Sequence, residues 1–468
     1  MQWNKVHFIG IGGVGMSATA KLLQDLGVEV SGSDENVYPP ISDFLREQKF
    51  ELKTPYAKAN IPADADAIVI GKNAKLVPGS NPEVAAAMQS GIIILSFPEV
   101  LSELSKGKET IVIAGSYGKS TSTALLAHCL DSIGKDPSFF IGAVPLKSKV
   151  SAKIGTSNIF LLEGDEYPSS NTDSRSKFLH YHPQDLLITP LAHDHFNIFP
   201  TPKDYLKPFK ELVVLPPKDA AVVVCIEGPM SKEFLLNINR PVITYGVYEG
   251  DFTAADIAWG EKTSFDIMHK DKKIVRVEMT QLGEHNIQNI VGVAALLFTK
   301  GFVTPEEFAS AAASFKGIKR RLNKKSDKTL IPIYEGFGSS YEKMKSALAA
   351  MKQHFPDRRL LVVFEPSTIG WRRRNALAQY EDVFNGASEV YIFNPPNDGK
   401  ETQLSIKEIA DRVAASGVPA FAAQTEAEVL GLLQSKLQVN DCVLLSSSGA
   451  MGGLTESIPE LAEQKFPF

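Results

Sequence analysis

A short glycine-containing loop has the residue types and spacing that bind the phosphates of ATP. It reads SYGKST at residues 116–121, between the apolar run TIVIAG and the helix-forming run ALLAHCL. Backbone N–H groups at Gly115 and Gly118 would face a phosphate, Lys119 would add a positive charge, and Ser120 would hold Mg²⁺. The usual pattern begins with an earlier glycine, where this chain has Ile113. The strand–loop–helix order favours an ATP site with Mg²⁺ over a plain turn.

A second glycine turn lies near the start of the chain, in VHFIGIGGVGMSATAKL. Gly10, Gly12 and Gly15 have the spacing G-x-G-x-x-G, and Asp34 ends the next predicted strand. This pattern indicates a phosphate-bearing ligand but does not distinguish NAD from a nucleotide sugar. A separate ATP loop favours a ligase, which needs one site for ATP and another for the molecule that it activates. A nicotinamide oxidoreductase stays open as the alternative.

Acidic and imidazole side chains follow two later strands, in LLEGDEY (161–167) and LAHDHFNIF (191–199). Ligands bind at the carboxyl ends of parallel strands, and oxygen ligands with one imidazole suit Mg²⁺. Glu163 and His195 are therefore the candidate metal ligands beside Ser120. The alternative is a solvated acidic loop with a structural histidine.

A polar helix start, GEHNIQN at residues 283–289, precedes an apolar helical run. Asn286 could cap the helix. Alternatively, His285, Asn286 and Asn289 could contact a nucleobase edge or a phosphate, and the residues alone do not decide between these two interpretations.

The elements that must position these groups predict an α/β fold with three domains. Short apolar runs alternate with helical runs, which indicates parallel sheets with crossover helices. A polar stretch, SKGKE, and a basic turn, KGIKRRL, separate the units, so we predict domains at residues 1–107, 108–315 and 316–468. Alternating residues between about 251 and 280 predict an antiparallel insertion in the second domain.

Composition excludes several other classes of protein. The chain has 468 residues, 44% hydrophobic and 22% charged, with a formal net charge of −5. This gives no global reason to bind nucleic acid or an anionic membrane. Its three cysteines are far apart in apolar runs, which predicts buried thiols in a reducing compartment. Without a signal peptide or a long apolar segment, we expect a cytoplasmic protein with no membrane partner.

The four motifs, in this order, resemble the muramyl ligases of cell-wall synthesis. The resemblance also rests on GSDENVYPP, FFIGAVP, EGDEY, RSKFLHY, DHFNIF and GIKRRL, and it covers nearly the whole chain up to residue 322. RSKFLHYHP (175–183) discriminates best, because the L-alanine-adding relative is shorter there. The resemblance implies a Rossmann-like UDP-binding domain, a central P-loop ATPase domain and a C-terminal Rossmann-like domain that receives the acceptor.

The resemblance also implies a reaction and its participants. An ATP-dependent, amide-forming ligase would join the murein tripeptide L-alanyl-γ-D-glutamyl-meso-diaminopimelate to UDP-N-acetylmuramate, through an acyl phosphate, in peptidoglycan recycling. Addition of L-alanine and a non-ligating UDP-sugar-binding protein are the alternatives, and we expect a monomer or weak dimer.

The site residues that the resemblance implies fall into four groups. Lys119, Ser120, Glu163 and His195 would be catalytic. Mg²⁺ would be held by Ser120, Glu163 and His195. ATP would be bound by Gly115, Gly118, Lys119, Ser120, Thr121, His285, Asn286, Asn289 and Arg321. The UDP-sugar would be bound by Gly10, Gly12, Gly13, Gly15, Ser33 and Asp34.

Departures from the family pattern concentrate in the third domain. YEGFGSSYEK (334–343) replaces an acidic pair, a histidine pair and a proline, and EPSTIGWRRR (365–374) replaces EPRSNTMK. The basic run 372–374 could meet an acidic peptide, or it could be a solvated helix start. The acceptor is therefore the least defined part of the prediction.

Overall fold

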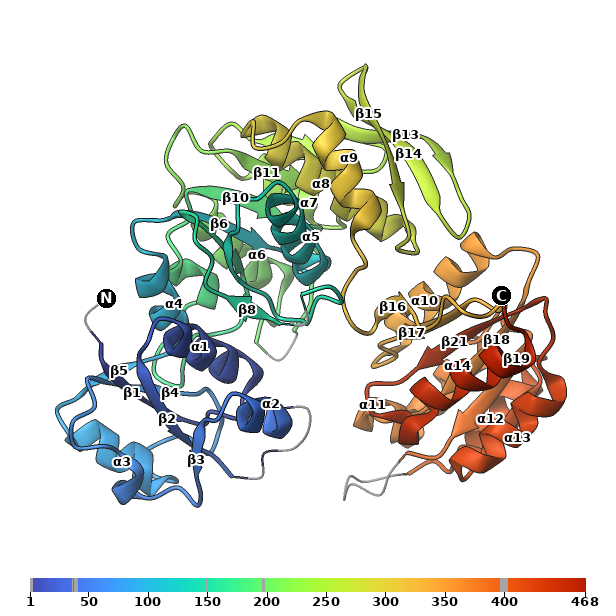
Figure 1. Ribbon diagram of the computed structural model, residues 1–468, viewed down its shortest axis with the longest axis horizontal. Helices are drawn as coiled ribbons and strands as arrows, with labels where there is room; N and C mark the ends of the chain where they lie inside the picture. Colours follow the sequence, from blue (N-terminus) through green and yellow to red (C-terminus); the bar gives the residue numbers. More distant parts are fainter. Residues whose placement is uncertain (1–2, 36, 38–40, 149, 196–197, 396–402) are drawn as a thin grey trace. The chain divides into compact units, whose positions relative to one another are not determined.

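The computed structural model describes residues 3–35, 37, 41–148, 150–195, 198–395 and 403–468. Parts of the motifs GSDENVYPP and DHFNIF lie outside these residues. The chain forms two compact units (Figure 1). Unit 1 comprises residues 1–256, 265–277 and 287–315, and unit 2 comprises 257–264, 278–286 and 316–468.

The first sheet of unit 1 is parallel throughout, with strand order β3-β2-β1-β4-β5. Its strands are β1 (Lys5–Ile9), β2 (Glu29–Ser33), β3 (Glu51–Lys53), β4 (Ala67–Ile70) and β5 (Ile93–Leu95). The helices between them are α1 (Val14–Asp25), α2 (Ile41–Glu47), η1 (Lys58–Asn60), α3 (Pro82–Gln89) and α4 (Phe97–Ser105). Capping explains two of the starts: Asn81 accepts from the N–H groups of Glu83 and Val84, and Ser96 forms a capping box with Glu99.

The second sheet of unit 1 has the order β15-β14-β13-β12-β11-β10-β6-β9-β7-β8. Its strands are β6 (Glu109–Ala114), β7 (Ser138–Phe140), β8 (Ala152–Lys153), β9 (Ile159–Glu163), β10 (Asp185–Ile188), β11 (Val222–Cys225), β12 (Ile243–Tyr245), β13 (Phe252–Ala258), β14 (Thr263–His269) and β15 (Lys272–Met279). The strands from β7 to β12 in this order pair in parallel. Links as short as residues 259–262 and 270–271 can join only antiparallel neighbours, so β13–β15 form the predicted insertion.

Six helices accompany this second sheet. They are α5 (Lys119–Ser132), η2 (Lys177–His180), α6 (Pro202–Leu212), α7 (Ser231–Leu236), α8 (Glu284–Thr299) and α9 (Pro305–Ser314). The helix predicted to follow the phosphate loop is therefore confirmed as α5.

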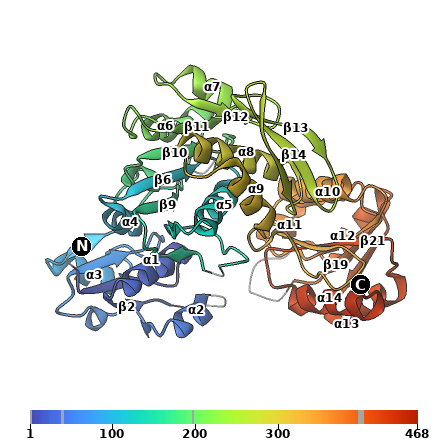
Figure 2. The ribbon, with the colours of Figure 1, turned by 45° about the horizontal axis from the view of Figure 1, so that its top comes forward.

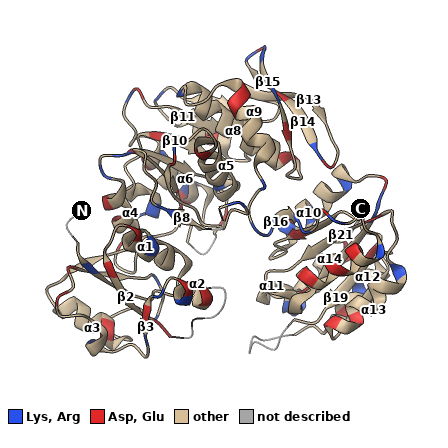
Figure 3. Cartoon of the chain, viewed as in Figure 1, with Lys and Arg blue, Asp and Glu red and all other residues tan. Residues whose placement is uncertain are grey.

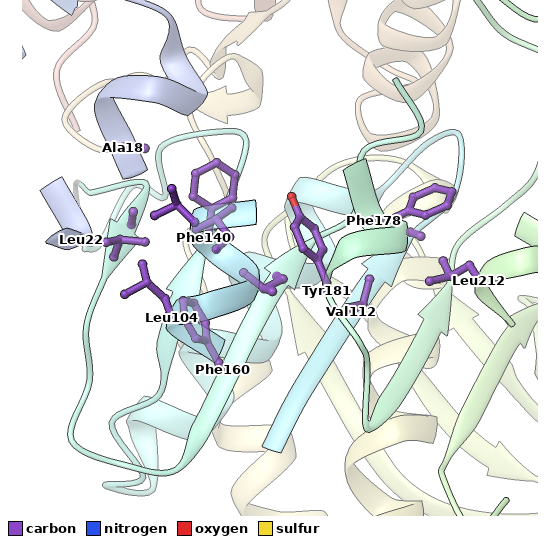
Figure 4. Close-up of a cluster of buried hydrophobic side chains, with 14 of the residues drawn as sticks. Ala18, Leu22, Leu104, Val112, Phe140, Phe160, Phe178, Tyr181 and Leu212 are labelled. Atoms are coloured by element: carbon purple, nitrogen blue, oxygen red, sulfur yellow. The ribbon is translucent and has the colours of Figure 1, made fainter. Parts of the chain in front are cut away.

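The two sheets of unit 1 share one hydrophobic core. Ala18 and Leu22 of α1 belong to the same buried cluster as Leu104, Phe140 and Phe160 (Figure 4). Because both sheets contribute apolar side chains to this cluster, their removal from water stabilises the packing of one sheet on the other.

The sheet of unit 2 has the order β16-β17-β21-β18-β19-β20, and all its pairs are parallel except β16–β17. Its strands are β16 (Arg321–Lys324), β17 (Ile333–Gly336), β18 (Arg359–Phe364), β19 (Glu389–Phe393), β20 (Ala420–Ala423) and β21 (Asp441–Ser446). Its helices are α10 (Tyr341–His354), α11 (Ile369–Arg372), η3 (Arg374–Glu381), α12 (Ile406–Ala415), α13 (Glu426–Lys436), η4 (Met451–Gly453) and α14 (Leu454–Lys465).

Alternate residues of β18 divide the core of unit 2 into two layers. Leu360 and Val362 pack with residues of α10 and α12, whereas Leu361 and Val363 pack with residues of α13 and α14. Figure 2 shows α10 on one side of this sheet and α13 and α14 on the other. This alternation follows from the two-residue period of a strand, and it gives the helix–sheet–helix layers predicted for this domain.

Four further expectations concern the fold class, the domain boundaries, the cysteines and membrane-spanning segments. The α/β fold is confirmed in all three sheets, while the boundaries at residues 107 and 315 stay predictions. Cys129, Cys225 and Cys442 are buried free thiols, as expected. Basic and acidic residues are interspersed along both units (Figure 3). No helix among the described residues has the length and apolar character needed to cross a membrane.

Candidate active site

The phosphate loop joins β6 to α5 at the carboxyl edge of the second sheet of unit 1, called the central sheet below. Two positions of the loop require glycine. Gly115 has φ of 135°, and a Cβ there would lie 2.1 Å from Thr189 Oγ1. Gly118 has φ of 85°, and a Cβ there would lie 2.3 Å from Asn289 Oδ1. The loop can therefore keep its backbone close to a ligand only with glycine at both positions.

Lys119, the first residue of α5, is held by the loop and by a buried carboxylate. Its Nζ donates to Gly115 O at 2.5 Å and to Glu166 Oε2 at 2.9 Å. Burial alone would lower the pKa of Lys119, but the charge of Glu166 outweighs it and raises the pKa above its ordinary value. Lys119 therefore remains a cation, the form that attracts phosphate.

His195 meets the other oxygen of the same carboxylate. Its Nε2 lies 3.1 Å from Glu166 Oε1, and its Nδ1 lies 2.8 Å from Tyr167 Oη. The Glu166 carboxylate raises the pKa of His195 above its ordinary value, against the opposing effect of burial. Glu166 thus lies between Lys119 and His195, and the sequence analysis did not single it out, although it lies within LLEGDEY.

Glu163 ends β9 beside the start of α5. Its Oε1 accepts from Ser120 Oγ at 2.8 Å, and its Oε2 accepts from the N–H of Gly142 at 2.5 Å. Burial raises the pKa of Glu163, despite the opposing hydrogen bonds. A carboxylate in such a place gains from a nearby cation, and the adjoining Ser120 and Glu163 oxygens suit the oxygen preference of Mg²⁺. Over the described ranges no three His, Cys, Asp or Glu side chains form a metal-binding group, so the predicted ligands are not a preformed cage.

The remaining predicted ATP contacts divide between the units. Asn289 is buried beside the loop, and its Oδ1 accepts from Ser122 Oγ at 3.3 Å. Thr121 is half-buried in the first turn of α5.

His285, Asn286 and Arg321 belong to unit 2 and are described with it. Asn286 lies inside α8 and donates to Leu282 O at 2.8 Å, so the interpretation of Asn286 as a helix cap is wrong. His285 is exposed next to it, and Arg321, at the start of β16, is exposed too.

The glycine turn between β1 and α1 binds the end of β2. The N–H groups of Gly10 and Ile11 donate to Ser33 O at 2.8 and 3.1 Å. The Gly12 N–H donates to Asp34 Oδ2 at 2.6 Å, and Tyr56 Oη donates to Asp34 Oδ1 at 3.0 Å. This amide of the turn therefore already binds a carboxylate, which shows that it can hold an anion.

The other predicted residues of this turn lie close by. Gly13 is the N-cap of α1, where backbone N–H groups favour negative charge. A Cβ on Gly15 would lie 3.0 Å from the ring of Phe97.

Ser33 lies in a buried polar network below the turn. Its Oγ donates to Glu83 Oε1 at 2.7 Å, and His7 Nε2 lies 2.8 Å from the same oxygen. Glu83 Oε2 accepts from the N–H of Ala57 at 2.9 Å and from Asn60 Nδ2 at 2.7 Å. The Ser33 side chain thus supports the turn, and the sequence alone gave no signal for Glu83.

The third-domain residues that depart from the family pattern are bound within unit 2. Glu335 pairs with Arg320 at 3.4 Å and with Lys325 at 3.3 Å. Arg372 is buried and donates to Pro366 O, and Arg374 pairs with Glu408 at 2.6 Å. These contacts favour a structural role for the two arginines over contact with an acidic peptide.

Comparison with known proteins covers most of the chain. Residues 5–109 match the family model described as "Mur ligase family, catalytic domain". Residues 113–297 match "Mur ligase middle domain", and residues 320–449 match "Mur ligase, glutamate ligase domain". A Hydrogenobaculum sp. protein named UDP-N-acetylmuramate--L-alanine ligase is 30% identical over 413 residues, covering 87% of this chain and 88% of the relative. The chain belongs to the Mur ligase family.

Other Mur ligases are similarly close. A Haemophilus influenzae protein named UDP-N-acetylmuramate--L-alanyl-gamma-D-glutamyl-meso-2,6-diaminoheptandioate ligase is 28% identical over 97% of this chain and 98% of the relative. The solved structure of UDP-N-acetylmuramate:L-alanyl-gamma-D-glutamyl-meso-diaminopimelate ligase from Neisseria meningitides is 31% identical, with a TM-score of 0.62, and the match covers 68% of this chain and 99% of that one. The family expected from the motifs is confirmed, and Mur ligase membership displaces the nicotinamide oxidoreductase alternative.

Proposed function

We propose that this Mur ligase uses ATP to couple the carboxylate of UDP-N-acetylmuramate to the amine of L-alanyl-γ-D-glutamyl-meso-diaminopimelate. One observation carries the proposal: unit 1 contains two separate loops that each contact a carboxylate of the chain, Glu166 at Lys119 and Asp34 at Gly12. A ligase of this type needs both, because ATP and the acid that it activates must be bound at the same time.

The residues around Lys119 would bind and orient ATP. Loop amides and the Lys119 ammonium would neutralise charge on the transferring phosphoryl group, while Glu166 holds Lys119 in place. Mg²⁺, held by Ser120, Glu163 and His195, would supply further positive charge at the phosphates. Asn289 would meet adenine, and the assignment of His285, Asn286 and Arg321 to ATP stays a prediction.

The glycine turn would bind the diphosphate of the sugar nucleotide. Gly10, Gly12, Gly13 and Gly15 lie in or beside the turn that leads into α1, whose N-cap is Gly13. A diphosphate oxygen would take the Gly12 N–H in place of the Asp34 carboxylate. Asp34 would then be free to accept a hydroxyl of the uridine ribose.

The reaction would follow in two steps. The sugar acid's carboxylate attacks the γ-phosphate, releasing ADP and forming an acyl phosphate. The peptide amine then attacks the acyl carbon through a tetrahedral intermediate, which expels phosphate and leaves an amide. Water must be excluded between the steps, because it would hydrolyse the acyl phosphate.

The tripeptide is the acceptor that the comparisons favour over nearly the full length of the chain. The Haemophilus influenzae relative, named for that acceptor, aligns over 97% of this chain, and the family resemblance predicts that the L-alanine-adding relative is shorter at RSKFLHYHP. L-Alanine is the second candidate, because the Hydrogenobaculum relative reaches 30% identity. We place the reaction in the cytoplasm, in a monomer or weak dimer.

Phosphate release tests the proposal directly. Purified protein with ATP, Mg²⁺ and UDP-N-acetylmuramate should release phosphate when the tripeptide is added. It should release none when UDP-N-acetylmuramate or the tripeptide is left out. Phosphate release with L-alanine in place of the tripeptide would show that the enzyme adds L-alanine instead. Tight UDP-N-acetylmuramate binding without turnover for either acceptor would leave a non-ligating binding protein.

A further inference from the structure

The segment between β9 and β10 folds back on itself and fixes one lysine, Lys177. Ser176 Oγ donates to Glu166 O at 2.6 Å, the N–H of Lys177 donates to Tyr167 O at 3.0 Å, and Phe178 is fully buried. At the tip, Asn171 Nδ2 donates to Asn73 O at 2.8 Å and to Leu76 O at 2.9 Å. The segment therefore connects the central sheet to the loop after β4.

The ammonium of Lys177 lies among groups from both sheets. It pairs with Asp165 Oδ2 at 2.5 Å and lies 5.8 Å from the centre of the Tyr167 ring. It also lies 5.3 Å from the centre of the Phe97 ring, which comes from α4 in the first part of unit 1. Its side chain keeps 14% of its surface exposed, so it has limited room for one further partner.

Each of these neighbours leads to one of the two nucleotide loops. On one side, Phe97 packs against Gly15 of the glycine turn. On the other side, Tyr167 contacts His195, and His195 meets the carboxylate that holds Lys119. Lys177 is therefore the cation that lies between the two loops.

A second positive charge lies nearby, on Lys72. Burial lowers the pKa of Lys72, and the charge of Lys177 lowers it further. No ion pair of Lys72 occurs within the part of the chain that the structure describes. Lys72 therefore lies within electrostatic range of both Lys177 and Asp165, and it adds a positive charge to the surroundings of Lys177.

We propose that Lys177 binds the reacting carboxylate of the sugar acid and directs it toward the ATP loop, with Lys72 adding positive charge. This inference rests on the proposed function. The diphosphate is held at the glycine turn, and the acid must extend from there to reach the γ-phosphate near Lys119. The group on that path that needs a cation is the carboxylate, and an ammonium can orient it with a charge-assisted hydrogen bond.

Binding of two matched ligands, measured by calorimetry without ATP, separates this role from others. UDP-N-acetylmuramate carries the carboxylate, and UDP-N-acetylglucosamine has the same diphosphate and ring without it. Lys177→Met should weaken binding of UDP-N-acetylmuramate by roughly 10- to 100-fold, the range for a lost hydrogen bond to a charged group, and leave UDP-N-acetylglucosamine within about 2-fold. Lys177→Arg, which keeps the charge, should retain most of the preference.

Lys108→Met is the matched control. Lys108 is also half-buried, with its ammonium 5.9 Å from the centre of the Phe160 ring, but it lies at the opposite edge of the central sheet. The Lys108→Met substitution should leave the affinities for UDP-N-acetylmuramate and UDP-N-acetylglucosamine unchanged. The melting temperatures of all variants should show that they are folded.

Three outcomes would overturn the inference. Equal weakening of both ligands by Lys177→Met would assign Lys177 to the diphosphate or to the fold, and no change in either would remove it from the site. A loss with Lys177→Arg as large as with Lys177→Met would exclude a role for the charge. Failure of the wild-type protein to bind either nucleotide would instead contradict the proposed function.

Discussion

The Lys119 ammonium lies 2.9 Å from a Glu166 carboxylate whose side chain is only 1% exposed. A buried carboxylate without a cation would be costly, so each residue of this pair fixes the other. The pair places a positive charge at the first turn of α5, where loop amides and the helix start also favour an anion.

Lys119→Ala should separate the two loops functionally. We expect turnover to fall by roughly 10³-fold or more, because the charge beside the transferring phosphoryl group is lost. UDP-N-acetylmuramate affinity should stay within about 2-fold of wild type, because Gly12 and Asp34 lie outside the Lys119 loop. Steady-state phosphate release and calorimetry measure the two quantities, and loss of both together would refute the separate sites.

Glu166→Gln should lower the pKa of His195. In the wild-type protein this pKa lies above its ordinary value of 6.5, so the protonated imidazole stabilises the fold. That contribution is fully present below pH 6.5 and is lost as the pH rises through the raised value. NMR titration of the imidazole should show the decrease in the variant, together with a flatter dependence of stability on pH in this window.

Asp194→Asn is the control for that titration. The Asp194 carboxylate lies farther from the ring, with Oδ1 3.7 Å from Nδ1. It should therefore lower the His195 pKa less than Glu166→Gln does. A larger decrease with Asp194→Asn would show that Glu166 is not the main partner of His195.

Glu83→Gln should destabilise the fold and loosen the glycine turn. We expect a loss of about 3 kcal/mol at neutral pH, because the buried carboxylate accepts several hydrogen bonds that a neutral amide would make more weakly. Burial would raise the pKa of Glu83, but hydrogen bonds from His7, Ser33 and Asn60 lower it below its ordinary value of 4.5. The stabilisation is therefore present above pH 4.5 and fades as the pH falls through the lowered value, so the variant and wild type should converge in acid.

Asp185→Asn tests whether neutralising any buried carboxylate would weaken UDP-N-acetylmuramate binding as Glu83→Gln does. Asp185 is fully buried and pairs with Lys300 at 2.8 Å, far along the chain from the glycine turn. Chemical denaturation should show a comparable loss of stability, but UDP-N-acetylmuramate affinity should fall only in Glu83→Gln. Equal affinities in the two variants would exclude a specific role for Glu83 below the turn.

Gly118→Ala should impair ATP binding through a clash as well as through backbone strain. Gly27→Ala is a matched control, because Gly27 has φ of 83° and open space around its Cβ, whereas a Cβ at Gly118 would lie 2.3 Å from Asn289 Oδ1. Strain should cost each variant about 1 kcal/mol, and the clash should cost Gly118→Ala a further ~1–3 kcal/mol. Thermal unfolding and ATP calorimetry compare them, and equal effects would exclude the clash.

Local patterns predicted the elements that carry the two loops. The apolar run TIVIAG became β6, and the run after SYGKST became α5. Both outcomes depend on residues that are neighbours in sequence. The α14 helix was not predicted, since Pro459 in its interior disfavours a helix in a reading based on local propensity.

Contacts between distant residues could not be predicted in the same way. Glu166 meets Lys119 across 47 positions, and Ser33 meets Glu83 across 50. Nothing in the local pattern marks such partners, because they are set by strand order and by which carboxyl ends adjoin in the sheet. Sequence patterns therefore found the glycines, the loop lysine, Asp34 and Glu163, but they missed the buried carboxylates of Glu166 and Glu83.

The core shared by Leu22, Leu104 and Phe140 has a consequence for turnover. Packed side chains join the platform of the glycine turn to that of the Lys119 loop, so their mutual alignment is acquired once, when the chain folds. Two substrates bound to these loops therefore lose less translational and rotational entropy on reaching the reactive geometry than they would if the two loops moved independently. A mutation that creates a cavity in this core should therefore slow catalysis even where the protein remains folded.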